Sequence, residues 1–246
     1  MASGGAPERP PRSPATLILL GSVAALLFAA LIALGIWQVE RRAWKHALIA
    51  QVDARIHAAP VAPPGAAEWP RITVQDAYRR VALSGHYLPG RETFVKAVTE
   101  RGPGFWALSP LATDRGFVVL VNRGFVAQPV APAPAGPVRV TGLLRMTEPV
   151  GGFLRANDPA GNHWFSRDVA AIAQARHLTE IAPYFVDADA ASSPPGGPVG
   201  GLTVVAFSDN HMIYALTWFG LALLVVIGVF IVAREERRVR RAAATR

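Results

Sequence analysis

The sequence of 246 residues contains no cysteine. That absence excludes a disulfide framework, a thiolate metal site, a cysteine nucleophile and a CxxC redox pair. Charge is also scarce, because only 17% of the residues are Asp, Glu, Lys or Arg whereas 51% are hydrophobic. This balance excludes a disordered or coiled-coil protein and points to the membrane.

The formal net charge of +8 lies mostly at the two ends of the chain. Residues 1–15 carry a net charge of +1 and residues 234–246 carry +4, whereas residues 38–211 hold 17 basic residues against 14 acidic ones. The central part is therefore nearly balanced, and we expect it not to bind nucleic acid.

Two uncharged runs, at residues 16–37 and 211–233, are long enough to cross a membrane. About 20 apolar residues in a helix span the roughly 30 Å of hydrocarbon in a bilayer. The first run has two interpretations, a cleaved signal peptide and a retained anchor. Its apolar core is longer than a signal core and no clear A-x-A site follows it, which favours the anchor.

Arginine positions predict the orientation of the two runs. Five arginines lie at residues 234–241, directly after the second run, and no cation lies at 208–210, directly before it. The positive-inside rule places the C-terminus in the cytoplasm, and two spans then place the N-terminus there too. We therefore expect cytoplasmic tails at 1–15 and 234–246, and an extracytoplasmic domain at 38–210, in a bacterial-type inner (cell) membrane. The cations Arg41, Arg42 and Lys45, just outside the first run, conflict locally with this rule.

Between the two runs the chain reads as an α+β domain. Apolar spacing continues the first helix from Gln38 to His57, and a Pro/Ala linker follows it. Short alternating runs predict strands at residues 80–87, 93–98, 104–109, 117–122, 138–145, 184–187 and 202–207, with a helix at 168–176. Because no long helices separate the central strands, we expect a mainly antiparallel sheet that forms a partial barrel.

Enzyme motifs are missing from this domain. It has no HExxH, P-loop, GxGxxG after a strand or GxSxG pattern, and the six histidines have no metal-ligand spacing. A membrane-anchored hydrolase would have to use Ser84 with His86 or Ser166 with Asp168, and neither pair has the context of a triad. We therefore expect a protein that is not an enzyme.

Several polar residues of the domain have simple structural interpretations. Asp187 and Asp189 lie beside a Ser/Pro/Gly-rich turn and are expected to be solvated loop charges. The pair His163–Trp164 is expected to be a turn that packs on the sheet. Arg123 is expected to pair with an acid of the domain, although it is also able to hold a carboxylate of a ligand.

Two side-chain stripes lie at the outer ends of the two runs, each on one helix face. They comprise Trp37, Arg41 and Trp44, with Lys45 beside them, and His211, Tyr214 and Trp218. An aromatic belt at the membrane boundary would account for the aromatic residues, but a belt does not require His211. The second interpretation is a haem site, in which His211 ligates the iron and cations from Arg41, Arg42 and Lys45 pair with the propionates.

The same residues resemble the surfeit locus protein 1 family. Residues 35–45 (GIWQVERRAWK) are similar to the family's GxWQxxRxxWK signature, and further similar motifs follow in the family's order. They are RVALSGHY at 80–87, GFWALSPL at 104–111, VLVNRGFV at 119–126, VTGLLR at 140–145, Trp164 with Asp168, and NHMIYALTWF at 210–219. Single motifs such as NRG are weak, whereas the ordered set is specific. Thr217 departs from the pattern, because Gln is expected there.

The resemblance implies a membrane factor for the assembly of haem-copper cytochrome c oxidase. Such a factor would bind haem a, with His211 as the axial ligand of the iron, and assist its insertion into subunit I. Trp37, Trp44, Tyr214 and Trp218 would flank the macrocycle, and Arg41 and Lys45 would hold the propionates. The implied partners are subunit I, haem a synthase and the lipid bilayer.

Two alternatives stay open at this point. One is a haem-free membrane scaffold that stabilises an assembly intermediate of subunit I. The other concerns the ligand set, because His46 lies near enough along the first helix to compete for the iron.

Overall fold

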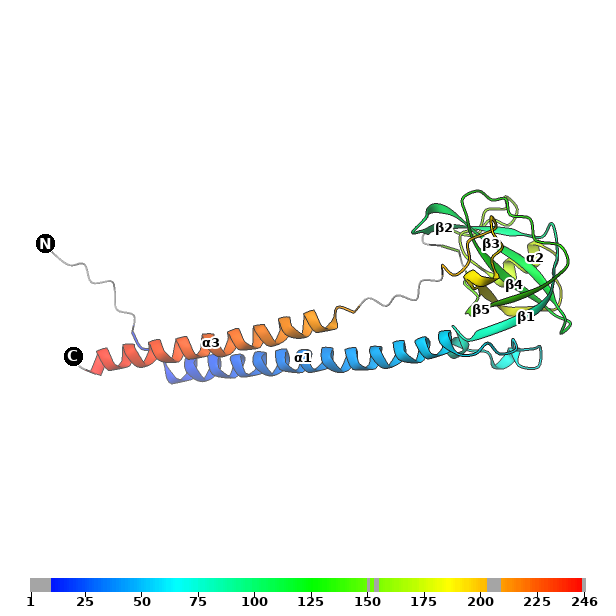
Figure 1. Ribbon diagram of the computed structural model, residues 1–246. Helices are drawn as coiled ribbons and strands as arrows, with labels where there is room; N and C mark the ends of the chain where they lie inside the picture. Colours follow the sequence, from blue (N-terminus) through cyan, green and yellow to red (C-terminus); the bar gives the residue numbers. More distant parts are fainter. Residues whose placement is uncertain (1–9, 150, 153–154, 203–208, 245–246) are drawn as a thin grey trace. The chain divides into compact units, whose positions relative to one another are not determined.

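The computed structural model describes residues 10–149, 151–152, 155–202 and 209–244 (Figure 1). The chain divides into two compact units. The first comprises residues 1–49 and 207–246, and the second comprises residues 50–206.

The terminal helices are α1 (Pro14–His57) and α3 (His211–Ala244). They contain 44 and 34 residues, so each exceeds the length needed to cross a bilayer. Only 6% and 11% of their most apolar windows are buried, which distinguishes them from the core helices of a soluble protein. Two such helices are consistent with a membrane protein. As predicted, α1 continues to His57. Helix α3 also continues past residue 233 through the arginines, a segment expected from the sequence only as a tail.

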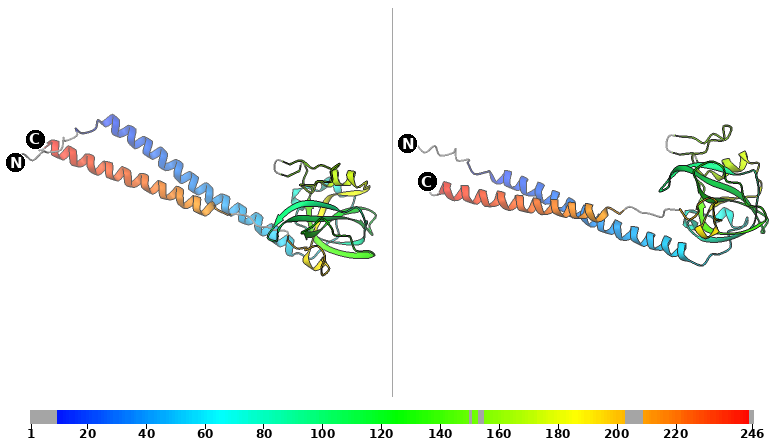
Figure 2. Two further views of the ribbon diagram at one scale, coloured as in Figure 1. Left: turned by 90° about the horizontal axis from the view of Figure 1, so that it is seen from above. Right: turned by 45° about the horizontal axis from the view of Figure 1, so that its top comes forward.

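The second unit is built on a six-stranded sheet in the order β1-β5-β6-β4-β3-β2. The strands are β1 (Arg80–Tyr87), β2 (Thr93–Thr99), β3 (Gly102–Thr113), β4 (Val118–Val126), β5 (Pro137–Met146) and β6 (Ile181–Ala188). A further pairing of β1 with β3 closes five of them into a barrel, and β2 extends beyond β3. All pairings are antiparallel except β4 with β6. The predicted partial barrel is therefore confirmed, and Figure 2 shows the strands curving around one another.

Most predicted strands are present, and several are longer than predicted. The strand predicted at 104–109 is the middle of β3, and the strand predicted at 184–187 is the second half of β6. The strand predicted at 202–207 lies outside the described residues from residue 203 onward. Short 3-10 helices, Trp69–Arg71, Val74–Asp76 and Ala190–Ser192, occupy the segments before β1 and after β6.

Closure of the barrel depends on a glycine. Gly85 of β1 pairs with Thr113 of β3 where the two strands meet. A Cβ atom at residue 85 would lie 2.0 Å from the backbone oxygen of Ala112. Only glycine permits this approach, so the position marks a barrel corner.

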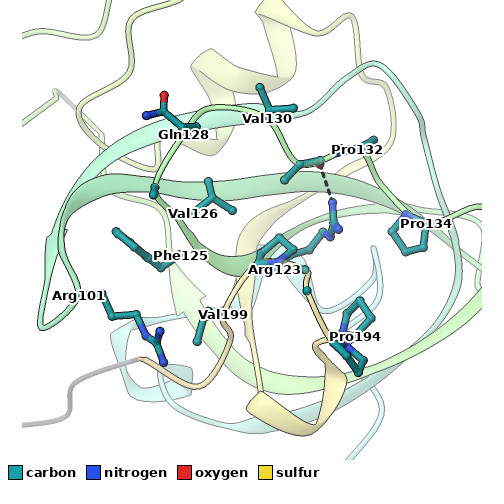
Figure 3. A pocket seen from close by; sticks show the side chains of 16 residues that line it. Arg101, Arg123, Phe125, Val126, Gln128, Val130, Pro132, Pro134, Pro194 and Val199 are labelled. Carbon is teal, nitrogen blue, oxygen red and sulfur yellow. Dashed lines mark hydrogen bonds between the residues drawn. The ribbon is translucent and has the colours of Figure 1, made fainter.

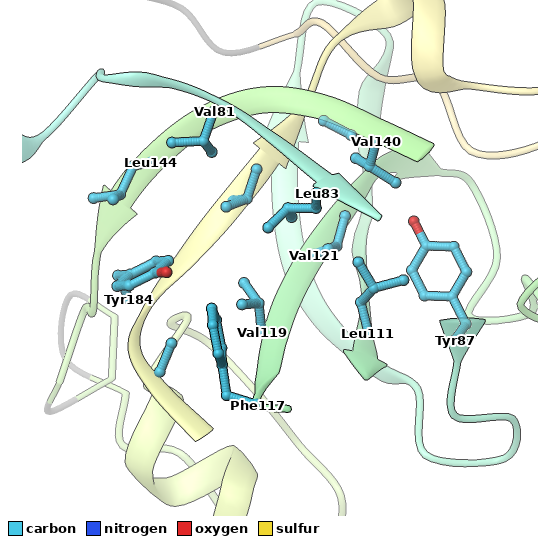
Figure 4. Packing of buried hydrophobic residues seen from close by; sticks show 13 residues of the cluster. Val81, Leu83, Tyr87, Leu111, Phe117, Val119, Val121, Val140, Leu144 and Tyr184 are labelled. Carbon is cyan, nitrogen blue, oxygen red and sulfur yellow. The ribbon is translucent and has the colours of Figure 1, made fainter. Parts of the chain in front are cut away.

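The barrel interior is filled by aliphatic and aromatic side chains from five strands (Figure 4). Val119 and Val121 of β4 point inward, whereas Leu120 points to the outer face. On β6, Tyr184 and Val186 face inward and Phe185 faces outward. Both faces of these central strands are buried, which explains why their sequences are continuous apolar runs.

A second core covers the outer face of the sheet. Helix α2 (Val169–Ala175) packs there through Val169 and Ile172, and the side chain of Asp168 caps its first turn. Trp164 is 1% exposed in the same cluster. Its indole N–H donates to Asn162 at 2.9 Å. The expected turn at 163–164 that packs on the sheet is confirmed.

A buried ionic cluster corrects one expectation. Asp187 is only 4% exposed, and its carboxylate accepts hydrogen bonds from Arg145 at 2.9 Å and Asn122 at 2.8 Å. Arg167 joins Asp187 to Glu148. Burial raises the pKa of Glu148, but hydrogen bonds and charge from Arg167 outweigh it and hold that pKa below its usual value. The interpretation of Asp187 as a solvated loop charge was wrong, because β6 carries this residue into the sheet.

We predict that Asp187→Ala lowers the free energy of unfolding by about 3–5 kcal/mol, because the largely buried Arg145 loses its carboxylate partner and Arg167 keeps only Glu148. Asp189→Ala is the control, since Asp189 pairs with Arg80 at the more exposed surface and its loss is expected to cost under about 1 kcal/mol. Urea unfolding of the full chain in detergent, followed by Trp fluorescence, measures both. Equal losses of unfolding free energy in the two variants would contradict the conclusion that Asp187 holds a buried ionic cluster together.

Candidate functional site

The candidate site lies in the first unit, where the start of α3 meets α1. The Nδ1 atom of His211 lies 2.7 Å from the Oε1 atom of Gln38. An amide oxygen only accepts hydrogen bonds, so Nδ1 carries the proton in this arrangement. The other ring nitrogen, Nε2, then holds a lone pair, and no described residue bonds it.

The residue two positions before His211 fastens the same junction. Asp209 accepts hydrogen bonds from Arg42 at 3.1 Å and from His46 at 2.7 Å. The backbone N–H of His211 donates to the same carboxylate at 3.1 Å. The hydrogen bond from His46, with smaller contributions from the other two donors, holds the pKa of Asp209 below its usual value. Two side chains one turn apart on α1 therefore hold Asp209, which lies two residues before the start of α3.

The far end of the helix pair is also fastened. Glu236 is 7% exposed and accepts hydrogen bonds from the backbone N–H of Arg12 at 3.0 Å and from Arg240 at 3.1 Å. The start of α1 thus lies beside the end of α3, and Gln38 lies beside the start of α3. The two helices are antiparallel.

Small residues allow the helices to approach between these ends. A Cβ atom at Gly35 would lie 2.3 Å from the ring of Phe219, so this ring fills the space that glycine leaves. Ala215 and Ala222 are each 1% exposed on the same side of α3. The Gly35 and Phe219 positions belong to the two motifs that flank the domain.

The side chains through which α1 and α3 touch form a line along each helix, which we call the contact line. The aromatic residues of the two predicted stripes lie beside this contact line and not in it. Trp37, Trp44 and Tyr214 are 53%, 54% and 55% exposed. The guanidinium of Arg41 stacks on the Trp44 ring at 4.1 Å from its centroid. The structure therefore brings His211 to α1 but leaves these rings on open flanks.

The two stripes nevertheless share one side of the helix pair. Each residue of an α-helix is rotated by about 100° from the one before it. Arg41 and Lys45 each come one residue before a contact residue of α1, and Tyr214 and Trp218 each come one residue before a contact residue of α3. In antiparallel helices these two displacements point to the same side. Arg41, Lys45, Tyr214 and Trp218 therefore lie on one side of the helix pair, distributed along the axis on both sides of the level of His211.

Trp218 is distinctive within the described residues, because its indole nitrogen is buried and has no hydrogen-bond partner. A buried donor without an acceptor is costly and is uncommon in native proteins. Trp218 follows His211 by two helical turns on the same face. Its N–H has no acceptor among the described residues.

Gln38 and Asp209 were not singled out from the sequence. Gln38 is the Q of the first motif, and Asp209 precedes the last motif by one residue. The spacing of Gln38, Arg42 and His46 at four-residue intervals predicts one helix face. The partner of that face is the start of α3, far away in the sequence. Residue spacing within α1 gives no information on how α3 packs against it.

His46, the competing ligand, has another role here. Its Nε2 atom bonds Asp209, and its side chain is about half exposed. The Nε2 atom of His211, in contrast, has no partner in the described chain.

The hydrolase pairs have no supporting geometry. Ser166 accepts hydrogen bonds from the backbone of Gly151 and the side chain of Asn157, while Asp168 caps α2. Ser84 and His86 lie in β1, and no hydrogen bond joins their side chains. Among the residues described, no three or more His, Asp or Glu side chains cluster as a metal site.

Fold and site define a class of protein in which two long apolar helices flank a small barrel domain in the sequence, and in which one imidazole lies where the two helices meet. Comparison with known proteins gives the family. The profile of the SURF1 family matches residues 25–223. Surfeit locus protein 1 of Mus musculus is 36% identical over 219 residues, which cover 80% of this chain and 70% of the mouse protein.

Further relatives carry the same family name. Surfeit locus protein 1 of Homo sapiens is 35% identical over 213 residues, covering 77% of this chain and 69% of the human protein. A SURF1-like protein of Drosophila melanogaster is 31% identical over 231 residues, covering 82% and 74% of the two chains. The chain belongs to the SURF1 family, which confirms the resemblance drawn from its motifs.

We predict that Gln38→Leu releases the tautomer of His211. In the unsubstituted protein the proton is on Nδ1, because Gln38 accepts it; without that acceptor, protonation at Nε2 becomes populated as well. Chemical shifts of ¹⁵N-labelled histidine report the ring tautomer. Thr217→Val is the control, since the Thr217 hydroxyl donates only to the backbone of its own helix. An unchanged His211 spectrum in Gln38→Leu would show that this hydrogen bond does not set the tautomer.

Proposed function

We propose that this protein is a non-catalytic assembly factor for haem-copper cytochrome c oxidase, which binds haem a and assists its insertion into subunit I. The observation that carries the proposal is the His211 imidazole, oriented by Gln38 and with Nε2 available. Membership of the SURF1 family supports a role in the assembly of cytochrome c oxidase, because the resemblance of the motifs to that family implies this role.

The residues present fit haem a. This group supplies an iron that accepts axial nitrogen ligands, two negatively charged propionates and a farnesyl tail that favours the bilayer. His211 offers the nitrogen, and the hydrogen bond from Nδ1–H to Gln38 is the outer contact that typically fixes a ligating imidazole. The buried N–H of Trp218 provides a donor on the same face.

We expect two cations on the same side of the helix pair to bind the propionates. Stacking on Trp44 holds the Arg41 guanidinium near the helix surface, and Lys45 lies one turn further along α1. Arg42 has a different task, because its hydrogen bond to Asp209 fastens the helices. Arg41 and Lys45 are therefore the proposed propionate ligands, with Trp37, Trp44, Tyr214 and Trp218 flanking the ring.

The site suits transfer rather than permanent binding. Trp37, Trp44 and Tyr214 are more than half exposed on the helix surface, so a ligand is able to enter and leave sideways from the bilayer. One imidazole ligand holds less tightly than two. The proposal places the site at the outer side of a bacterial-type inner membrane, with both termini in the cytoplasm and haem a synthase and subunit I as partners.

A haem-free scaffold for an intermediate of subunit I is the second candidate. Exposed apolar side chains on the barrel unit favour it, notably Val98 at 85% and Val130 at 75% exposure. A scaffold acts by contact alone, so this candidate requires that barrel surface, and not His211, determines oxidase assembly.

We predict that His211→Ala lowers the haem a content of the purified protein by about tenfold or more, because the iron loses its axial nitrogen. The protein is purified in detergent from cells that also produce the enzymes of haem a synthesis, and the absorption spectrum is recorded. His46→Ala is the matched control and is expected to keep its haem a, since His46 is engaged with Asp209. Haem-free protein with an intact His211 would favour the scaffold.

We predict that Trp218→Phe weakens haem a binding while leaving the axial ligand in place. Phenylalanine keeps an aromatic ring in the span but removes the buried N–H donor. The same spectra measure the haem a content, and Trp37→Phe is the control for loss of an exposed indole. If the two substitutions had equal effects, the buried donor of Trp218 would have no special role.

A further inference from the structure

A cavity in the barrel unit, separate from the helix pair, contains a buried cation. Its volume is about 790 Å³, and it lies between two proline-containing loops, residues 127–134 and 194–199 (Figure 3). Arg123 of β4 lies at its base and Phe125 at its side. An adjoining cavity of about 440 Å³ shares Arg123 and several of the same prolines.

Arg123 occupies an unusual place for a charged residue. It is 7% exposed and follows the inward positions 119 and 121 of β4, at the end of the apolar barrel interior. Its Nη1 atom donates to the backbone oxygen of Ala131 at 2.9 Å and approaches the Ser109 hydroxyl at 3.4 Å. The expected ion pair with an acid of the domain does not occur within the described residues, so that expectation was wrong.

Arg123 lines both cavities, and its guanidinium lies 5.5 Å from the centroid of the Tyr87 ring. Neither Nε nor Nη2 has a hydrogen bond to a described residue, and neither is sealed from solvent. A guanidinium presents such a pair of N–H groups as a fork that matches the two oxygens of a carboxylate.

The surroundings do not neutralise this charge. Burial lowers the pKa of Arg123, and electrostatic interactions with Tyr87 and Glu92 only partly offset this effect. Burial also raises the pKa of Tyr87 to about 12, so Tyr87 is a neutral phenol at neutral pH. The Glu92 carboxylate accepts a hydrogen bond from the backbone of Ala133. In the described chain neither cavity has an acidic residue in its lining, whereas Arg101 and Arg139 border one cavity each.

The cavity walls are built into the fold. Gly124 has a φ of +126°, and a Cβ there would lie 2.2 Å from the backbone of Val199. This approach allows Val199 and Phe125 to exchange two backbone hydrogen bonds of 2.9 Å. Ser193 accepts a further hydrogen bond from the backbone of Gly200 at 3.0 Å. The second loop is thus fixed on β4, and proline side chains supply rigid apolar walls without N–H donors.

We propose that Arg123 anchors a carboxylate-binding site between the two proline loops, with a ligand whose apolar body contacts the prolines and Phe125. The site takes one carboxylate, because a single guanidinium fork in an apolar setting balances one negative charge. The source is either an acidic side chain of a partner polypeptide or a free carboxylic acid. This inference does not depend on haem binding.

Isothermal titration calorimetry of the full chain in detergent tests the site with two matched pairs of probes. They are acetyl-Leu-Glu-Leu-amide against acetyl-Leu-Gln-Leu-amide, and 4-methylpentanoate against 4-methylpentanamide. Each carboxylate is expected to bind at least about tenfold more tightly than its amide partner, which is the range for a charge-assisted pair. Tighter binding of the peptide assigns the site to a partner polypeptide, and tighter binding of the free acid assigns it to a small molecule.

Variants separate this site from a general effect of charge. Arg123→Gln is expected to lose the preference for carboxylate, while Arg71→Gln keeps it, because Arg71 is exposed and lines neither cavity. Arg123→Lys preserves the charge if Arg123→Gln does not fold, and its carboxylate affinity is expected to fall about tenfold for lack of a fork. Failure of both carboxylates to bind, tighter binding of inorganic phosphate, or equal binding to the Arg123 variants would overturn the proposal.

Discussion

The hydrogen bond between Gln38 and His211 is the interaction on which the proposed site depends. It connects the start of α3 to α1 and at the same time decides which nitrogen of the imidazole keeps a lone pair. A histidine at the end of an isolated helix would have neither a fixed ring nor a fixed tautomer. The ionic contacts of Asp209 on one side and the close packing at Gly35 on the other hold the helices where this bond is made.

Charge is used in three different ways in this chain. At the helix ends, Asp209 and Glu236 fasten two helices whose remaining contacts are small and apolar. Inside the barrel unit, Asp187 and its arginines form a satisfied cluster, in which each buried charge has an opposite partner. Arg123 lacks such a partner in the described chain. That contrast, rather than exposure or position, singles it out as a binding residue.

Much of the fold could be predicted from the sequence. The two apolar runs, the continuation of α1 to His57, and the alternating strands are properties of local pattern, so the helices and most strands were recognised. The barrel was foreseen because no long helices separate the central strands. The full lengths of β3 and β6 were not, since residues such as Pro110 and Pro183 interrupt the pattern without ending the strands.

The site was predictable only in part. His211 and the stripe residues follow from spacing and from the family motifs, whereas the partners of His211 and Asp187 come from segments far away in the sequence. Asp187 looked like a loop residue because a Ser/Pro/Gly turn follows it closely. Its burial is set by pairing of β6 with β4 and β5, a tertiary event that overrides local composition.

In the proposed site, one histidine nitrogen, from His211, ligates haem a. The most direct test is pulsed electron-nuclear double resonance of the ferric, haem a-loaded full chain with ¹⁵N-labelled histidine. The account predicts hyperfine coupling to a single histidine Nε2, which remains in His46→Ala and is absent in His211→Ala. Coupling to two histidine nitrogens, or a signal unchanged by loss of His211, would contradict it.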